Sequence, residues 1–321
     1  RLTEMFGVEH PIVMGGMTGV GYAELVAAVA DSGALGFITA HMFDSAEGLE
    51  KEIQRTRDLT DKPFGVNMTI LPSINPIPYD EYRQAICETG IKIVETAGRS
   101  PEPHLPDFKA NGVKVIHKCT SVRHAKTAER VGVDAISIDG FECAGHPGED
   151  DVTIIVLLPA TADAVEIPVI ASGGMADGRS LVAALALGAD GVNMGTRFLA
   201  TKEAGIHANV KQQIVDNTER DTVLINRTLR NTSRVARNSV SEQVVEIQLD
   251  AAKTFDDVKE LVAGTRGRAN VLEGGDIDGG IWTVGQSQGL IHDIPTCKEL
   301  VSGIMEEAES VLAGRLTGMR T

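Results

Sequence analysis

The sequence predicts a closed (β/α)₈ barrel with a helical segment added near its C-terminal end. Three observations support this fold class. Short apolar runs alternate with helix-length amphipathic segments over the first two thirds of the chain. Aromatic residues make up only 4% of the 321 residues, while Ala, Gly and Val are plentiful, as in strands that helices cover. A chain of this length can also form one large barrel-type domain.

Eight strands are expected, one for each βα unit of a barrel. The helix-length segments between them include residues 22–32, where Leu25, Ala28 and Val29 have the i, i+3, i+4 spacing of one helix face. Glycines such as Gly33 and Gly132 precede the next strand, where helices commonly end. In chain order the expected strands are residues 11–17, 35–41, 64–70, 91–98, 113–120, 135–140, 167–174 and 191–198.

A doubly wound open sheet is the alternative architecture. That fold commonly begins with G-x-G-x-x-G, followed by an acidic residue about 20 positions later. The run from Gly15 to Gly19 matches this pattern only loosely. We therefore favour the barrel, in which the loops after the strands form the active site.

Residues 1–205 are expected to form the barrel, and residues 206–275 a helical lid or substrate subdomain. The latter contains helical patterns at 207–217, 241–249 and 255–263, and a basic stretch with Arg227, Arg230, Arg234 and Arg237. Internal salt bridges are the favoured explanation of these arginines, and phosphate binding is the alternative. Residues 276–321 are expected to pack back on the barrel, and the loop at 71–79, with three prolines, to form a semi-rigid gate.

Charge and cysteine usage exclude several classes of function. The net charge of −15 argues against a nucleic-acid partner, because binding phosphates requires clustered Lys and Arg. The four cysteines form no CxxC pair, which indicates a reduced cytoplasmic protein without a zinc site. No run of about 18 apolar residues predicts a membrane span.

Two neighbouring strands end in loops suited to phosphate. Ser172, Gly173 and Gly174 follow the seventh strand, and Gly195 and Thr196 follow the eighth. Barrels commonly bind phosphate at these two loops, where glycine lets backbone N–H groups approach closely. The alternative is that these glycines simply end buried strands.

His146 is the predicted catalytic residue. It lies in a loop with Gly145 and Gly148 directly after the sixth strand, and an imidazole titrates near neutral pH. Lys118, near the end of the fifth strand, is a charged residue in an apolar run and needs a partner. That partner is either a bound ligand or Asp139 on the next strand.

Several motifs together resemble the nitronate monooxygenase family, formerly the 2-nitropropane dioxygenases, and especially its bacterial class I branch with the related NADH:quinone reductases. The resemblance extends over nearly the whole chain. Its motifs are Gly15-Gly16-Met17, Gly65-Val66-Asn67, Val115–Thr120, Asp139–Glu149, Ala171–Gly174, Asn193–Phe198 and Gly280–Gln286.

The resemblance implies a barrel with non-covalent FMN, a helical substrate domain and His146 as the catalytic histidine. In such a site Asn67 would serve the pyrimidine edge of the flavin, and Lys118 would stabilise its reduced form. The implied FMN contacts, to which the glycine loop adds Gly173, are Gly16, Met17, Asn67, Lys118, Asp139, Ala144, Gly145, Ser172, Gly174, Gly195 and Thr196.

The leading functional hypothesis is a cytoplasmic nitronate monooxygenase that oxidises alkyl nitronates with O₂. The alternatives are an NADH:quinone oxidoreductase, with NADH as electron donor, an FMN-type enoyl-acyl-carrier-protein reductase, and a flavin-binding sensor without activity. The reductase branch tends to carry a large polar–aromatic pair where this chain has Thr18 and Gly19, which implies a wider site. We also expect a homodimer.

Overall fold

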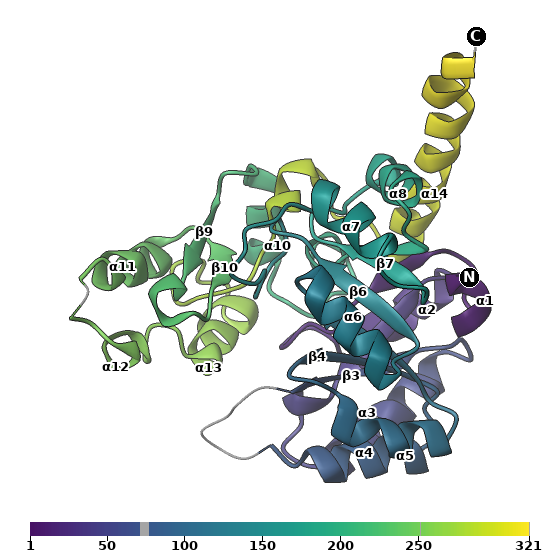
Figure 1. Ribbon diagram of the computed structural model, residues 1–321. Helices are drawn as coiled ribbons and strands as arrows, with labels where there is room; N and C mark the ends of the chain where they lie inside the picture. Colours follow the sequence, from purple (N-terminus) through teal and green to yellow (C-terminus); the bar gives the residue numbers. More distant parts are fainter. Residues whose placement is uncertain (71–76, 251, 321) are drawn as a thin grey trace.

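Eight parallel strands close into a barrel in the computed structural model, which describes residues 1–70, 77–250 and 252–320 (Figure 1). Each strand pairs with its neighbours in chain order, and β1 pairs with β8 to close the barrel. The predicted (β/α)₈ fold is therefore confirmed, and the open sheet is excluded. The strands are β1 (Ile12–Met14), β2 (Leu35–Thr39), β3 (Gly65–Ile70), β4 (Ile93–Gly98), β5 (Lys114–Cys119), β6 (Ala135–Asp139), β7 (Val169–Ser172) and β8 (Gly191–Asn193).

Six of the eight expected strands, β7 and β8 among them, end earlier than predicted. β7 ends at Ser172, because Gly173 and Gly174 adopt φ angles of 91° and 77°, which lie outside strand geometry. β8 ends at Asn193, and Thr196–Leu199 forms the short helix α9. The expected strand at 191–198 was therefore wrong over its last residues.

Helices cover the outside of the barrel between successive strands (Figure 1). Local sequence fixes several of their starts: the side chains of Ser45 and Ser121 accept hydrogen bonds from the first turns of α3 and α6. The helices around the barrel are α1 (Leu2–Phe6), α2 (Ala23–Asp31), α3 (Ala46–Leu59), α4 (Tyr79–Glu88), α5 (Leu105–Ala110), α6 (Val122–Val131), α7 (Ile154–Ala162) and α8 (Gly178–Ala186).

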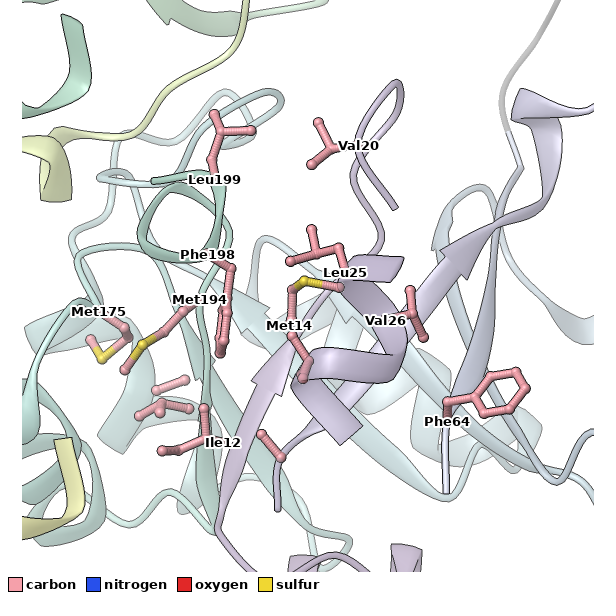
Figure 2. Close-up of a cluster of buried hydrophobic side chains, with 14 of the residues drawn as sticks. Ile12, Met14, Val20, Leu25, Val26, Phe64, Met175, Met194, Phe198 and Leu199 are labelled. Carbon is pink, nitrogen blue, oxygen red and sulfur yellow. The ribbon is translucent and has the colours of Figure 1, made fainter. Parts of the chain in front are cut away.

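The C-terminal helix α14 (Cys297–Val311) packs against α8 and α2. The approach is close: a Cβ on Gly178 would lie 2.5 Å from the backbone of Ile304 and Ala308. Figure 2 shows part of the core around Met14, Leu25 and Phe198, where the first and last βα units meet.

Between α9 and α14 the chain forms a separate group of elements that lies beside the barrel in Figure 1. The predicted helices are present, although the last ends at Val258. The segment also contains strands that we did not predict, since β9 (Thr222–Ile225) and β10 (Ser233–Ala236) form an antiparallel hairpin. The helices are α10 (Ala208–Asp216), α11 (Ser239–Gln248), α12 (Phe255–Val258) and α13 (Gly264–Arg266).

The domain boundaries at residues 205 and 275 remain predictions. Most of the expected gate at 71–79 lies outside the described residues, since these begin again at residue 77. Within the described ranges, no helix has both the length and the apolar character needed to cross a membrane.

Candidate active site

A cavity of about 850 Å³ opens at the carboxyl ends of the barrel strands. It brings together all but one of the predicted site residues, although those that line it come from five different βα units. Asn67 is the exception. The predicted residues that line the cavity are Gly16, Met17, Lys118, Asp139, Ala144, Gly145, His146, Ser172, Gly173, Gly174, Gly195 and Thr196.

His146 lies in the loop between β6 and α7, and more than a third of its surface is open to the cavity. The loop turns at Gly145 and Gly148, whose φ angles of 70° and 84° favour glycine. A Cβ on Gly148 would lie 2.9 Å from the side chain of Thr120. Desolvation by the surrounding protein lowers the pKa of the His146 imidazole below its ordinary value, and the negative charge of Glu149 offsets this only in part. The imidazole is therefore neutral at pH 7.

The β9–β10 hairpin holds this loop along its length. Gly145 and Arg234 exchange backbone hydrogen bonds of 3.0 and 2.6 Å. The Arg234 guanidinium donates to the Phe141 carbonyl oxygen at 2.9 Å and lies over the Phe141 ring. Farther along, the Glu149 carboxylate accepts hydrogen bonds of 2.9 and 2.5 Å from the backbone and hydroxyl of Thr232.

The arginine cluster is used mostly for internal contacts, as predicted. Arg227 pairs with Asp151 at 2.6 Å, and Arg237 with Glu242 at 3.4 Å. Arg230, at the tip of the hairpin, is exposed and lines the cavity.

Glu95 of β4 is a central residue that sequence reasoning missed. Its side chain is fully buried, and Oε2 accepts hydrogen bonds from the Gly16 backbone at 2.8 Å and from Asn67 Nδ2 at 2.6 Å. Oε1 accepts from Asn193 Nδ2 at 3.2 Å. A charged residue inside the apolar run at 91–98 is the signal that could have identified it, by the argument used for Lys118.

Lys118 Nζ lies 3.9 Å from Glu95 Oε1, so Glu95 and not Asp139 is its ion-pair partner. Burial by itself would lower the pKa of the Lys118 ammonium, but the carboxylates of Glu95 and Asp139 outweigh that effect and raise it. A permanent positive charge therefore lies at the base of the cavity.

Asn67 supports the cavity from below. It is almost fully buried: Nδ2 donates to Glu95, and Oδ1 accepts from the Thr69 hydroxyl at 3.0 Å. A Cβ on Gly16 would lie 2.3 Å from the Asn67 side chain, so only glycine fits above it. A direct contact of Asn67 with a cofactor remains a prediction.

The predicted phosphate loops meet at the far side of the cavity. The left-handed Gly173 and Gly174 follow β7, and Gly195 precedes α9. Here the structure adds a segment that we did not predict as part of the site: the Gly285 backbone N–H donates to Thr196 Oγ1 at 2.9 Å, and both residues line the cavity. These loops, which we call the glycine cradle (Ser172–Gly174, Gly195, Thr196 and Gly285), place backbone donors where a phosphate could bind.

Asp139 provides a test of whether these residues fit a flavin. It lies in the cavity wall, burial raises its pKa, and among the described residues its Oδ1 has no hydrogen-bond partner. A buried polar atom without a partner is costly, and a bound group with a donor would satisfy it. Together with the N–H donors of the glycine cradle and the Lys118 cation, this acceptor suits the phosphate and the ring of a flavin nucleotide.

A second imidazole, which the sequence analysis did not predict, lies at the end of β2. His41 Nε2 is 2.9 Å from the Thr18 hydroxyl, and both residues line the cavity. Burial lowers the pKa of His41, so this side chain is also neutral at pH 7. Cys143, in contrast, is buried, and burial raises the pKa of its thiol, which disfavours the reactive thiolate.

Comparison with known proteins places this site in a family. The family model described as nitronate monooxygenase matches residues 1–307. A curated relative from Rhodococcus jostii (strain RHA1), "(3aS,4S,5R,7aS)-5-hydroxy-7a-methyl-1-oxo-octahydro-1H-indene-4-carboxyl-CoA dehydrogenase", is 34% identical over 96% of this chain and 95% of its own length. A "Probable nitronate monooxygenase" from Staphylococcus aureus (strain Newman) is 34% identical over 78% of this chain and 81% of its own.

Among solved structures, FabK from Thermotoga maritima is 36% identical, with a TM-score of 0.92 over 99% of this chain and 98% of that chain. The chain therefore belongs to the nitronate monooxygenase family, and this membership makes it a flavin-dependent oxidoreductase.

Proposed function

We propose that this protein binds FMN in the glycine cradle and oxidises an alkyl nitronate, or its parent nitroalkane, with O₂ as the electron acceptor. The observation that carries the proposal is a neutral His146 in the same cavity as the cradle. Bound FMN would supply the redox chemistry, which amino-acid side chains do not provide.

His146 would act on the substrate through its uncharged ring. At neutral pH a lowered pKa leaves one ring nitrogen free to accept a proton, which suits a base better than a cationic anchor. A nitroalkane carries an acidic C–H beside its nitro group, and His146 would remove that proton. With a nitronate, which has already lost it, the ring N–H would donate a hydrogen bond to a nitro oxygen.

Lys118 would have an electrostatic role. Glu95 holds its ammonium at the base of the cavity, and its raised pKa keeps it charged. A fixed cation near a flavin stabilises the negative charge that the ring gains on reduction. Asp139 Oδ1 would accept a hydrogen bond from the bound flavin.

The test begins with purified, FMN-loaded protein and aerobic assays with propyl-2-nitronate, and separately with NADH plus benzoquinone. We expect nitronate-dependent O₂ consumption and no rapid anaerobic bleaching of the flavin by NADH. Rapid bleaching without nitronate turnover would reassign the protein to the NADH:quinone reductases. A preparation that stays colourless with excess FMN would overturn both.

Oxidation or reduction of an acyl thioester is the second candidate function, and the size of the cavity favours it. The cavity of about 850 Å³ is lined not only by the cradle but also by His124 and Thr127 of α6, which suits a substrate larger than a small nitronate. The R. jostii relative, which matches over nearly the whole chain, carries a carboxyl-CoA dehydrogenase name. A thioester also has an acidic α C–H, so the same base would serve. Anaerobic flavin reduction by a panel of acyl-CoA compounds, or reoxidation of reduced flavin by enoyl thioesters, tests this candidate.

A further inference from the structure

The cavity has an outer part that the cofactor contacts do not use. Beyond the glycine cradle and His146, two groups of residues line it: the hairpin tip with Arg230, Asn231 and Thr232, and the first turns of α6 with His124 and Thr127. A group held by the cradle would occupy the other end. The outer part is therefore available to the distal portion of a long substrate or co-substrate.

The charges of the lining residues single out Arg230. Two permanent cations, Lys118 and Arg230, line the cavity, and Lys118 is paired with Glu95. Over the described part of the chain, the Arg230 guanidinium makes no ion pair and no side-chain hydrogen bond. The nearby carboxylates are otherwise engaged, since Glu149 accepts from Thr232 and Asp151 pairs with Arg227. In a protein with a net charge of −15, the Arg230 guanidinium therefore offers an unpaired positive charge to an anion in the cavity.

The backbone fixes the position of Arg230. Arg230 and Asn226 have φ angles of 50° and 61°, a left-handed conformation that a side chain other than glycine adopts only at a conformational cost. Contacts on both sides hold the tip: Asn226 exchanges two hydrogen bonds of 2.8 Å with the Gln248 side chain, and Thr232 binds Glu149. The tip is thus tied to the loop that carries His146.

We propose that Arg230 and Asn231 bind a phosphate or diphosphate group on the tail of a substrate or co-substrate whose reactive end lies beside His146. Guanidinium pairs with phosphate through two parallel N–H···O hydrogen bonds, and the Asn231 amide adds a third donor. His124, which lies 3.2 Å from the Arg123 guanidinium, adds a further polar group from α6. The proposal rests on the proposed oxidoreductase function for the reactive end. Because an alkyl nitronate carries no phosphate, the tail belongs to an acyl thioester or to a nucleotide co-substrate.

A phosphate-bearing tail could belong to a CoA thioester or to a nicotinamide nucleotide, and direct binding distinguishes the two. Titration of FMN-loaded protein with CoA and pantetheine compares a thiol with and without the phosphate-bearing tail, and NADH and reduced nicotinamide riboside form the matching second pair. We expect the full-length member of one pair to bind at least tenfold more tightly than its truncated partner. Arg230→Gln should remove that preference, and Arg230→Lys should restore part of it.

Arg237→Gln is the matched control, because it removes the same charge from the same hairpin at a residue that pairs with Glu242. Raising the salt concentration should weaken binding to the wild type and the control more than to Arg230→Gln. Equal affinities for the full and truncated ligands, or equal losses in the two arginine variants, would overturn the proposal. Because binding is measured without turnover, a negative nitronate assay would leave this result intact, and a colourless protein would show that the oxidoreductase function itself had failed.

Discussion

The base of the cavity is held by contacts inside the barrel, whereas its rim is held by contacts with a segment outside the barrel. At the base, Glu95 connects Gly16, Asn67 and Asn193 through hydrogen bonds and lies beside Lys118, so β1, β3, β5 and β8 are joined inside the barrel. At the rim, the His146 loop is held by a hairpin that begins some 80 residues later in the chain. The comparison teaches that the charged groups at the base of the cavity are part of the barrel core, whereas the position of the His146 loop depends on an added segment.

The largest effect on stability is expected from disrupting the interactions of Glu95 at the base of the cavity. Glu95→Gln removes the charge opposite Lys118 and turns an NH₂ group toward N–H donors. We expect a loss of about 2–4 kcal/mol in the free energy of unfolding, somewhat below the cost of breaking a fully buried pair because Lys118 is 22% exposed. Urea unfolding measures the change, and weaker FMN retention should accompany it. The exposed Glu246→Gln should change stability by less than about 0.5 kcal/mol, and an equal effect in both variants would disprove the central role of Glu95.

The buried His117 is expected to make the free energy of unfolding depend on pH. It lies beside Lys118 on β5, and burial, with a smaller contribution from His124, lowers its pKa to about 4. Because the unfolded chain binds this proton at about pH 6.5, stability should be complete above that pH and fall as the pH drops toward 4. The expected loss is about 3 kcal/mol.

Unfolding measured across this pH range in the wild type and in His117→Asn checks the prediction. In the variant, the free energy of unfolding should change less with pH. Some change should remain, because other histidines also have lowered pKa values. Identical pH profiles for the two proteins would show that His117 does not titrate as described.

His146→Ala tests whether the imidazole at the rim of the cavity takes part in turnover. We expect turnover to fall by about 10²-fold or more, with FMN still bound and the free energy of unfolding nearly unchanged, because the side chain is partly exposed. The wild-type rate should stay level above neutral pH and fall as His146 gains a proton below its ordinary range. His10→Gln, at the opposite end of β1, is the control. A variant with unchanged kinetics would remove His146 from the mechanism.

The smallest effect is expected from removing one hydrogen bond between the His146 loop and the hairpin. Thr232→Val removes the hydroxyl that donates to Glu149 and keeps the side-chain shape. We expect kcat to fall a few-fold, in line with about 1 kcal/mol for one hydrogen bond, while the affinity for FMN stays constant. Thr228→Val, on the exposed part of the same hairpin, should have no effect. A loss of FMN affinity in Thr232→Val would mean that rim and base are coupled.

The barrel and the glycine cradle could be predicted because their signals are local. Each strand is a short apolar run, and Gly173, Gly174 and Gly195 lie directly after two of these strands. The rule that parallel strands present their carboxyl ends at one face then brings these loops together without knowledge of any long-range contact.

Other features depend on contacts between distant residues and could not be predicted in this way. The hairpin strands have four residues each and lie in an arginine-rich stretch, so alternation gave too weak a signal. Asn67 was assigned to the cofactor from its place at a strand end, but its partners Glu95 and Gly16 become visible only when the barrel closes. Likewise, the contact of Gly285 with Thr196 joins residues 89 positions apart.

The hydrogen bond from the Gly15 backbone to Asn193 Oδ1 has a consequence for how the protein is made. It joins the first strand to the last, across 178 positions of sequence. A ribosome must therefore release the eighth strand before the first can complete the binding face, and such distant pairing slows folding. Until then the nascent polypeptide has no finished pocket. Cofactor capture should accordingly come late and stabilise only chains whose ring of strands has closed.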